Sequence, residues 1–255
     1  MRFEIKYIVH RSKLDRLREM IKPFVRPDKN VANNPDFTYT VRSLYFDTPD
    51  LLYYYEKIEG VPHRLKLRMR TYDRPETAAP MFFEIKRKHR VPMTKNRAPF
   101  KYSTALDILK NGLTIEEYPD KDPARIADCQ RFLFHLHRDN LAPTVLVVYD
   151  REPYEAILDK TIRITFDKNL RSGLRDEVND IYDQDLKPVM HEHFILEVKY
   201  NTSYPGWMRA IANSLDIKQV SASKYCMSME NHKEVFERDQ WSKVIQFRNS
   251  IQQRA

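Results

Sequence analysis

Charged and apolar residues alternate along several short segments of the chain, and this alternation constrains the fold more than any other feature. Every second residue from Arg64 to Arg70 is a cation, and the residues between them are apolar. The same period of two runs through 2–9, 82–88, 162–167 and 194–200. Because successive side chains of a strand point to opposite faces, the pattern predicts β-strands with one charged and one apolar face.

Further strands and helices follow from β-branched runs and helix-capping signals. The predicted strands are 2–9, 38–46, 63–72, 81–88, 143–150, 161–167 and 193–200. The predicted helices are 12–21, after a capping box of Ser12 and Asp15, and 103–110, 122–136, 205–215 and 230–254. No linker separates these elements, so residues 1–255 are expected to form one domain that ends in the helix 230–254.

Carboxylates are mixed with the cations on the charged faces. Three strands place a glutamate two residues before a lysine, as Glu4–Lys6, Glu84–Lys86 and Glu197–Lys199. One explanation is an antiparallel sheet whose charged face lies in water. The other is a functional face, because neighbouring cations repel each other unless an anion lies among them. If the sheet closes with this face inward, it forms an antiparallel β-barrel with a charged lumen and helices packed outside, an α+β fold suited to a polyanion and a divalent cation.

The balance of charges favours an anionic partner. The chain has 255 residues, with 44 lysines and arginines against 36 aspartates and glutamates, which gives a net charge of +8. Such a charge suits nucleic acid, phosphorylated ligands or an acidic membrane surface. The four glycines lie too far apart to form a Walker A loop or a dinucleotide-binding loop, so side-chain cations would have to hold any phosphate.

Cys129 and Cys226 are the only cysteines, which excludes a disulfide framework and a cysteine-based zinc site. Two isolated thiols suit a reducing cytoplasm. The N-terminus has the pattern of a strand and not of a signal peptide, and the richest apolar run, Val145 to Tyr149, is too short to cross a bilayer. We therefore expect a cytoplasmic protein without a membrane segment, for which a membrane partner stays open.

An ordered set of motifs connects the charged segments to a known family. The motifs are RFEIKY (2–7), SLYFDTPD (43–50), LKLRMRTY (65–72), FFEIKRK (82–88), MTK (93–95), YDRE (149–152), IRITFD (162–167), ILEVKY (195–200) and SKY (223–225). In this order they resemble the VTC domain, the vacuolar transporter chaperone type of polyphosphate polymerase within the CYTH-like triphosphate tunnel metalloenzymes. The resemblance implies an antiparallel β-barrel whose charged lumen holds a triphosphate chain and Mg²⁺ or Mn²⁺.

The resemblance also implies roles for charged residues of these motifs. The expected catalytic residues are Lys6, Arg68, Arg70, Lys86, Arg163 and Glu197. Further cations expected to bind phosphate are Lys66, Lys88, Lys95, Arg151, Lys199 and Lys224. The expected ligands of Mn²⁺ or Mg²⁺ are Glu197 as the principal one, with Glu4 and Glu84 as supporting carboxylates.

The activity that the resemblance implies is transfer of the γ-phosphoryl group of ATP to a growing inorganic polyphosphate chain. The first Glu-x-Lys motif lacks the additional glutamate of the hydrolase and cyclase branch, which favours the VTC branch. Ser221 stands where the VTC pattern has a lysine, so a phosphohydrolase acting on triphosphate or short polyphosphate stays the first alternative. A non-catalytic polyanion-binding module is the second alternative. Nucleic acid is not expected, because no aromatic residues interleave with the basic ones.

Two other features have ordinary structural explanations. The histidine pairs at positions 135 and 137 and at positions 191 and 193 have no cysteine or third histidine nearby, so we expect structural or exposed roles and not a metal site. The aromatic run from Tyr53 to Tyr55 could stack on a base, but we expect it to pack against a helix.

Overall fold

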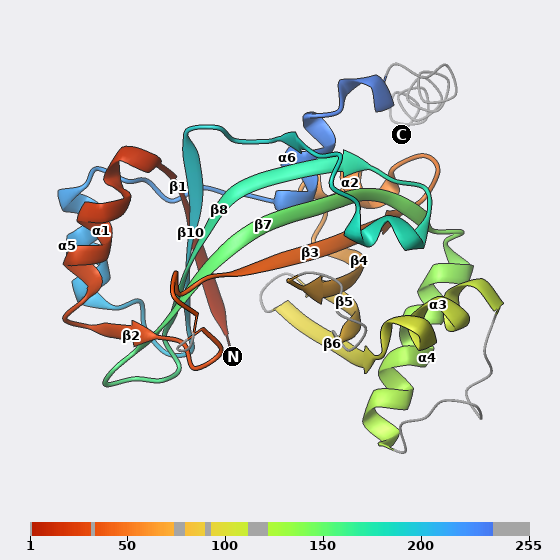
Figure 1. Cartoon of the computed structure of the whole chain (residues 1–255), viewed down its shortest axis with the longest axis horizontal. Helices are drawn as coiled ribbons and strands as arrows, with labels where there is room; N and C mark the ends of the chain where they lie inside the picture. The colour runs from red at the N-terminus through yellow and green to blue at the C-terminus, as the bar shows by residue number, and fades with distance from the viewer. Residues whose placement is uncertain (1, 32–33, 74–79, 90–92, 112–121, 237–255) are drawn as a thin grey trace.

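The computed structural model describes residues 2–31, 34–73, 80–89, 93–111 and 122–236 (Figure 1). The strands are β1 (Phe3–His10), β2 (Val25–Pro27), β3 (Tyr39–Asp47), β4 (His63–Tyr72), β5 (Met81–His89), β6 (Met93–Phe100), β7 (Ala142–Ala156), β8 (Arg163–Leu174), β9 (Lys187–Pro188) and β10 (His193–Tyr200). The helices are α1 (Leu14–Ile21), α2 (Leu52–Ile58), α3 (Tyr102–Asn111), α4 (Pro123–Arg138), α5 (Gly206–Ser214) and α6 (Lys224–Glu230). Short 3₁₀ helices lie at Arg11–Lys13, Val178–Tyr182 and Lys233–Val235.

The ten strands form a single antiparallel sheet in the order β1-β10-β8-β7-β3-β4-β5-β6, with β2 beside β7 and β9 beside β8. The predicted closed barrel is wrong, because the end strands β1 and β6 do not pair with each other along the residues that the structure describes. The segment 217–220 borders β1 instead: the N–H of Val220 donates to the carbonyl of Lys6 at 2.9 Å, and Gln219 forms a β-bridge with Tyr7. Alternation determines the face of each side chain, whereas closure also requires matched strand tilt and stagger.

All seven predicted strands are present, and the main error concerns β6. The strands β7 and β8 extend beyond their predicted C-terminal ends at residues 150 and 167. The strand β6 was not expected, because its sequence contains Asn96 and Pro99 and has no apolar alternation. It forms because it pairs with β5 from Met93 to Phe100. The short β2 and β9 likewise depend on pairing with long neighbours.

The predicted helices near 12–21, 103–110, 122–136 and 205–215 correspond to α1, α3, α4 and α5. The helix α2 was missed; it contains Tyr53 and Tyr54, which are buried. The expected helix 230–254 is not continuous at its start, because α6 ends at Glu230 and a 3₁₀ helix follows, while residues 237–255 lie outside the described residues. Within the described part of the chain, every helix is too short or too polar to cross a bilayer.

Helices cover the sheet in three regions (Figure 1), and apolar side chains pack between them and the strands. At the end formed by β4 and β5, Leu67 and Phe83 pack against α3 and α4. At the end formed by β1, β8 and β10, Leu196 packs against α1 and α5. A third cluster lies on the opposite face, where Tyr45 and Tyr149 contact α2 and α6. Helices therefore cover one face of the sheet at both of its ends, and α2 and α6 cover part of the other face.

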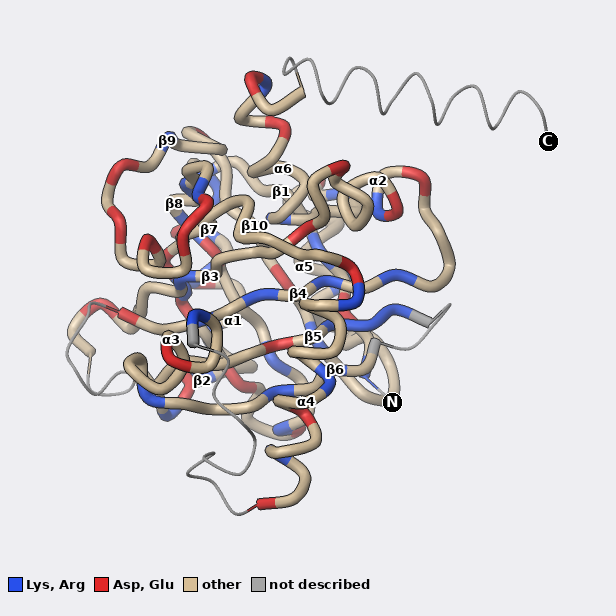
Figure 2. The backbone as a smooth tube through the Cα atoms, turned by 90° about the vertical axis from the view of Figure 1, so that its right-hand side faces the viewer, with Lys and Arg blue, Asp and Glu red and all other residues tan. Residues whose placement is uncertain are grey.

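The charged side chains gather on one face of the sheet, as the alternation predicted. We call this the charged face; its central residues are Glu4, Lys6, Arg68, Arg70, Glu84, Lys86, Arg151, Asp167, Glu197 and Lys199. Figure 2 shows blue and red segments following the strands. The sheet curves enough that Glu4 and Lys6 of β1 both affect the pKa of Lys86 in β5, although five strands lie between β1 and β5 in the sheet order.

Candidate functional site

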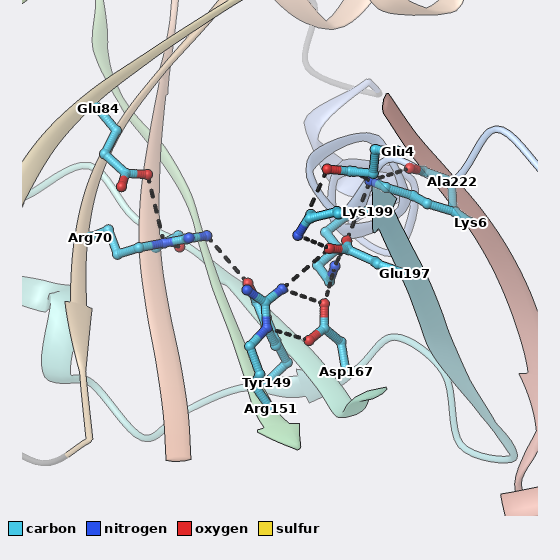
Figure 3. Close-up of polar contacts among 12 residues, drawn as sticks. Glu4, Lys6, Arg70, Glu84, Tyr149, Arg151, Asp167, Glu197, Lys199 and Ala222 are labelled. Atoms are coloured by element: carbon cyan, nitrogen blue, oxygen red, sulfur yellow. Dashed lines mark hydrogen bonds and ion pairs between the residues drawn. The ribbon is translucent and has the colours of Figure 1, made fainter. Parts of the chain in front are cut away.

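Glu197 and Asp167 form an acidic centre on the charged face, where they are only 4% and 0% exposed (Figure 3). Lys224, the first residue of α6, reaches both: its Nζ lies 2.7 Å from Glu197 Oε1 and 2.5 Å from Asp167 Oδ2. Arg151 donates to Asp167 through Nε and Nη2, each at 2.7 Å, and to Glu197 Oε2 at 3.4 Å. Two cations from different elements thus hold two buried carboxylates.

The first and last Glu-x-Lys motifs form a square of alternating charges beside this centre. The antiparallel register of β1 and β10 sets Glu4 opposite Lys199 and Lys6 opposite Glu197. Lys6 Nζ is 3.1 Å from Glu4 and 3.5 Å from Glu197, and Lys199 Nζ is 2.8 Å from Glu197 and 3.8 Å from Glu4. Because β1 and β10 pair antiparallel, the glutamate of each motif lies opposite the lysine of the other. The two Glu-x-Lys motifs therefore neutralise each other's charges.

The cations keep the carboxylates of this square ionised. Burial by itself would raise the pKa of Glu197, but Lys199, Lys224, Lys6 and Arg151 together hold it well below its usual value. For Glu4, burial and the nearby Glu197 act to raise the pKa, yet the surrounding lysines lower it to about 2. Both groups are therefore anionic at neutral pH and can serve as ion-pair partners or as oxygen ligands.

The third Glu-x-Lys motif has different surroundings. Glu84 is 0% exposed and lies between Arg68 of β4 and Arg97 of β6 in the strand register. Arg68 donates to its Oε2 at 2.8 and 2.6 Å, and Lys95 lies 2.6 Å from its Oε1. Burial acts to raise the pKa of Glu84, but Arg68, Arg70 and Lys95 lower it strongly. Glu84 is therefore the shared ion-pair partner of several cations. Among the described contacts, it forms no ion pair with Lys86, the lysine of its own motif.

Three lysines lie side by side across β4, β5 and β6: Lys66 is opposite Lys86, which is opposite Lys95. Repulsion from Arg68, together with burial, lowers the pKa of Lys86 well below its usual value. Burial lowers the pKa of Lys66 to about 8 and that of Lys95 to about 8. Among the described residues no carboxylate forms an ion pair with Lys66 or Lys86. This row therefore offers positive charge to an added anion.

Most of the predicted site residues come together in two clusters. Around Glu197 lie Glu4, Lys6, Arg151, Lys199 and Lys224; around Glu84 lie Arg68, Arg70 and Lys95. Tyr149 joins them, because Arg70 donates to its hydroxyl at 3.2 Å and the Arg151 guanidinium lies 5.2 Å from its ring centre (Figure 3). The charged face thus carries one connected polar network from β5 to β1.

Four predicted residues lie outside both clusters: Lys66 and Lys86 of the lysine row, and Arg163 and Lys88. The side chain of Arg163 is 47% exposed, and its ion pair is with Asp28 at 3.8 Å. Lys88 lies exposed near the end of β5, opposite Arg64. Their positions on the charged face agree with the alternation, but neither contacts the carboxylates of the two clusters.

Three residues of the charged face were not predicted as site residues from the sequence: Asp167, Arg97 and Tyr149. Asp167 had a usable signal, because it alternates in phase with Arg163 on a strand with a charged face. Arg97 had none, since β6 does not show a strand pattern. Tyr149 lies in an apolar run, and only the register of β7 with β3 and β8 brings its hydroxyl to Arg70.

The carboxylates of Glu4, Glu197 and Asp167 are the donors that fit Mg²⁺ or Mn²⁺, since these ions take hard oxygen ligands. Across the described ranges, no three His, Cys, Asp or Glu side chains are grouped so as to hold an ion. Mg²⁺ often binds through one or two carboxylates together with substrate phosphates and water, so three protein ligands are not required. The donor set therefore fits such an ion in the company of a phosphate chain.

No curated protein sequence matches this chain. Among solved structures, the PH1819 protein from Pyrococcus horikoshii OT3 is 13% identical, over 91% of this chain and 100% of that chain, with a TM-score of 0.46. This likeness is too slight to inform fold or function. The family model described as VTC domain matches residues 1–233. The chain therefore belongs to the VTC domain family.

Proposed function

We propose that this protein is a metal-dependent polyphosphate polymerase, which transfers the γ-phosphoryl group of ATP to a growing inorganic polyphosphate chain. Membership of the VTC domain family indicates a polyphosphate-related function. The observation that supports the specific proposal is the charged face, where cations from β1, β4, β6, β7, β10 and α6 converge around the buried carboxylates of Glu84, Asp167 and Glu197. Such a surface suits a linear anion with many charges.

The cations of the charged face offer two kinds of contact to phosphate. Arg68 and Arg70 present planar guanidinium groups, which can grip phosphate oxygens with two hydrogen bonds. Lys66 and Lys86 provide compact charges that no carboxylate neutralises among the described residues. The arginines would orient the phosphoryl group, and the lysines would compensate charge along the chain.

The proposed reaction does not depend on a general base. The nucleophile is an anionic terminal oxygen of the polyphosphate chain, so no proton has to be removed before the attack. Phosphoryl transfer proceeds in line, with charge spread over the equatorial oxygens, so positioning and electrostatic stabilisation dominate catalysis. Glu197, with Glu4 and Asp167 beside it, would hold Mg²⁺ or Mn²⁺, which supplies positive charge to the transferring phosphoryl group when bound.

Binding of phosphate must compete with the ion pairs already present. Lys6, Lys199 and Lys224 each contact Glu197. A phosphate chain that recruits these lysines leaves Glu197 with less compensating charge, which favours the uptake of a cation there. We therefore expect nucleotide and divalent cation to bind with positive coupling, measurable as a lower Kd for each in the presence of the other.

Incubation of the purified protein with ATP and Mn²⁺ or Mg²⁺ tests the proposal. A ladder of long polyphosphate on a gel, with release of ADP, supports the polymerase. Orthophosphate without a ladder would identify a hydrolase, and binding without turnover would identify a polyanion-binding module. Glu197→Gln should lower turnover by about a hundredfold or more while the cations still bind ATP. Glu192→Gln, at a carboxylate that is 56% exposed, is the matched control and should retain turnover.

We also propose ATP and inorganic polyphosphate as the partners of this chain, with the cytoplasm as the compartment of the reaction. Cys129 and Cys226 are both free thiols, which supports a reducing compartment. A membrane-bound partner that receives the polymer stays a prediction. Fractionation of cells that express the tagged protein would test the location.

A further inference from the structure

Asp47 is a buried carboxylate on the charged face that belongs to neither of the two clusters. It is the last residue of β3 and only 1% exposed, and it lies on the same side of the strand as Tyr45, the register partner of Arg68. Within the ranges that the structure describes, no cation forms an ion pair with Asp47. The carboxylates of Glu84 and Glu197, by contrast, are paired with lysine and arginine. The role of Asp47 therefore follows from the neutral groups that donate to it.

Four hydrogen bonds hold the Asp47 carboxylate, and two neighbouring helices supply three of them (Figure 1). The backbone N–H groups of Thr48, and of Tyr53 and Tyr54 in α2, donate to it at 2.8, 2.9 and 2.9 Å. The fourth donor is the hydroxyl of Tyr225, the second residue of α6. Burial raises the pKa of Asp47 to about 6, although these hydrogen bonds lower it. A costly buried carboxylate thus links β3 to α2 and α6.

Tyr225 directly follows Lys224, whose ammonium group reaches the two carboxylates of the acidic centre at 2.7 and 2.5 Å. The helix α6 that carries both residues has only seven residues, and a helix this short is not stable by itself in water. Contacts with the rest of the fold must therefore hold it in place. The ring of Tyr225 stacks on Tyr45, with 5.1 Å between the ring centres, and the hydrogen bond to Asp47 adds a defined direction to this contact.

We propose that Asp47 is a positioning residue: through the hydroxyl of Tyr225 it holds α6 so that Lys224 stays at the acidic centre. Burial and the nearby Asp47 raise the pKa of Tyr225 well above its usual value, so its hydroxyl keeps the proton that it donates. The part of Lys224 in binding phosphate rests on the proposed function. The link from Asp47 to Lys224 does not, because it follows from contacts within the chain.

A second anchor for α6 is needed because Lys224 has to change partners when it binds phosphate. Its two ion pairs hold the helix to the acidic centre in the structure. These ion pairs weaken as the ammonium group turns to a phosphate oxygen, and α6 can then move unless another contact retains it. The bond between Tyr225 and Asp47 involves no cation, so phosphate does not compete for it. It can hold α6 in the free and in the bound protein.

Acylation of lysines in the Tyr225→Phe variant tests the link without any activity. The substitution removes the hydroxyl and keeps the ring that stacks on Tyr45. An amine-reactive reagent attacks neutral amines, and mass spectrometry gives the rate at each lysine. Lys224 should react slowly in the wild type, because its side chain is 8% exposed and, against the effect of burial, Asp167 and Glu197 raise its pKa well above the usual value. In Tyr225→Phe the rate at Lys224 should rise about fivefold, as for the loss of one hydrogen bond.

Tyr53→Phe is the matched control. It removes another buried tyrosine hydroxyl that donates to a carboxylate, at 2.5 Å to Asp139, and leaves the backbone bond of Tyr53 to Asp47 in place. The rate at Lys224 should stay within about twofold of the wild type in this variant. Lys168, whose side chain is 18% exposed and paired with Glu152, is the internal reference and should react at the same rate in all three proteins.

Asp47→Asn connects the effect to the carboxylate itself. It turns an amide donor toward the donors of Tyr54 and Tyr225, so it should also accelerate acylation of Lys224. Combined with Tyr225→Phe, it should give less than the product of the two single effects, because both changes act on one bond. Effects that multiply would overturn the role of Asp47. If Asp47→Asn does not fold, Tyr225→Phe and its control decide the matter.

The proposal is overturned if Tyr225→Phe leaves the rate at Lys224 unchanged, or if Tyr53→Phe or the reference Lys168 shows the same rise, which would indicate a general loss of stability. Calorimetry with inorganic triphosphate tests the functional consequence: Tyr225→Phe should raise the Kd about fivefold, and Tyr53→Phe should not. Faster acylation of Lys224 with an unchanged Kd would confirm the link and contradict the phosphate-binding part of the proposed function.

Discussion

Replacing Lys66 by methionine should make the protein more stable while weakening its hold on condensed phosphate. Burial lowers the pKa of Lys66 from 10.5 to about 8, so keeping the side chain charged at neutral pH costs the folded state free energy. The difference of about 2.5 pH units, at about 1.4 kcal/mol each, corresponds to about 3 kcal/mol. Methionine has a similar length and no charge. It loses the hydrogen bond to Ser223, worth about 1 kcal/mol, so we expect a net gain of about 2 kcal/mol.

The gain should depend on pH in a defined direction. Between pH 8 and 10.5, Lys66 holds its proton in the unfolded chain but not in the folded one, so wild-type stability rises with pH over this window. The variant lacks this rise. The advantage of Lys66→Met should therefore be fully present below about pH 8 and disappear as the pH approaches 10.5.

Urea denaturation at about pH 7 and about pH 10 would measure both effects, because comparison of the two proteins at each pH cancels the titration of all other groups. Lys22→Met, at a side chain that is 75% exposed, is the control and should leave the free energy of unfolding unchanged. A variant less stable than wild type at neutral pH, or an equal difference at both pH values, would refute the reasoning. Calorimetry with long-chain inorganic polyphosphate should show weaker binding.

Three further predictions concern the carboxylates of the charged face. Glu84→Gln should lower the free energy of unfolding by about 3 kcal/mol, because it leaves buried cations without their anion; urea denaturation beside Glu192→Gln measures this. Asp167→Asn should strengthen triphosphate binding in calorimetry, because it releases Arg151 for a phosphate group. Glu4 has its pKa lowered to about 2, so its contribution to stability should be complete above pH 4.5 and be lost toward pH 2; Glu4→Gln should then converge with wild type in acid denaturation.

Alternation predicted the faces of the sheet well, because strand geometry leaves a side chain only two directions. Arg87 illustrates this: the period places it on the apolar side, and there it donates to Asn96 at 2.7 Å and contacts His135 at 3.2 Å. The order of the motifs in turn identified the family, although one Glu-x-Lys motif alone would not have done so.

Features that depend on contacts between distant segments could not be predicted. The strand β6 exists because β5 offers it a full ladder of hydrogen bonds, and its own residues give no strand signal. The open sheet and the closed barrel have the same alternation, so only the pairing of the end strands distinguishes them. The exposed position of Arg163 also depends on distant parts of the chain, since its ion pair is with Asp28.

The open sheet leaves two edges at which a second molecule could add a strand and start aggregation, a hazard that full closure would abolish. At one edge, β6 carries Lys95, Arg97 and Pro99; charges and a proline oppose the addition of another strand. At the other edge, the segment 217–220 lies along β1 through its bonds to Lys6 and Tyr7. The segment that leads to Lys224 on the charged face therefore also shields the sheet from intermolecular pairing, and its removal should lower solubility before it affects any contact with phosphate.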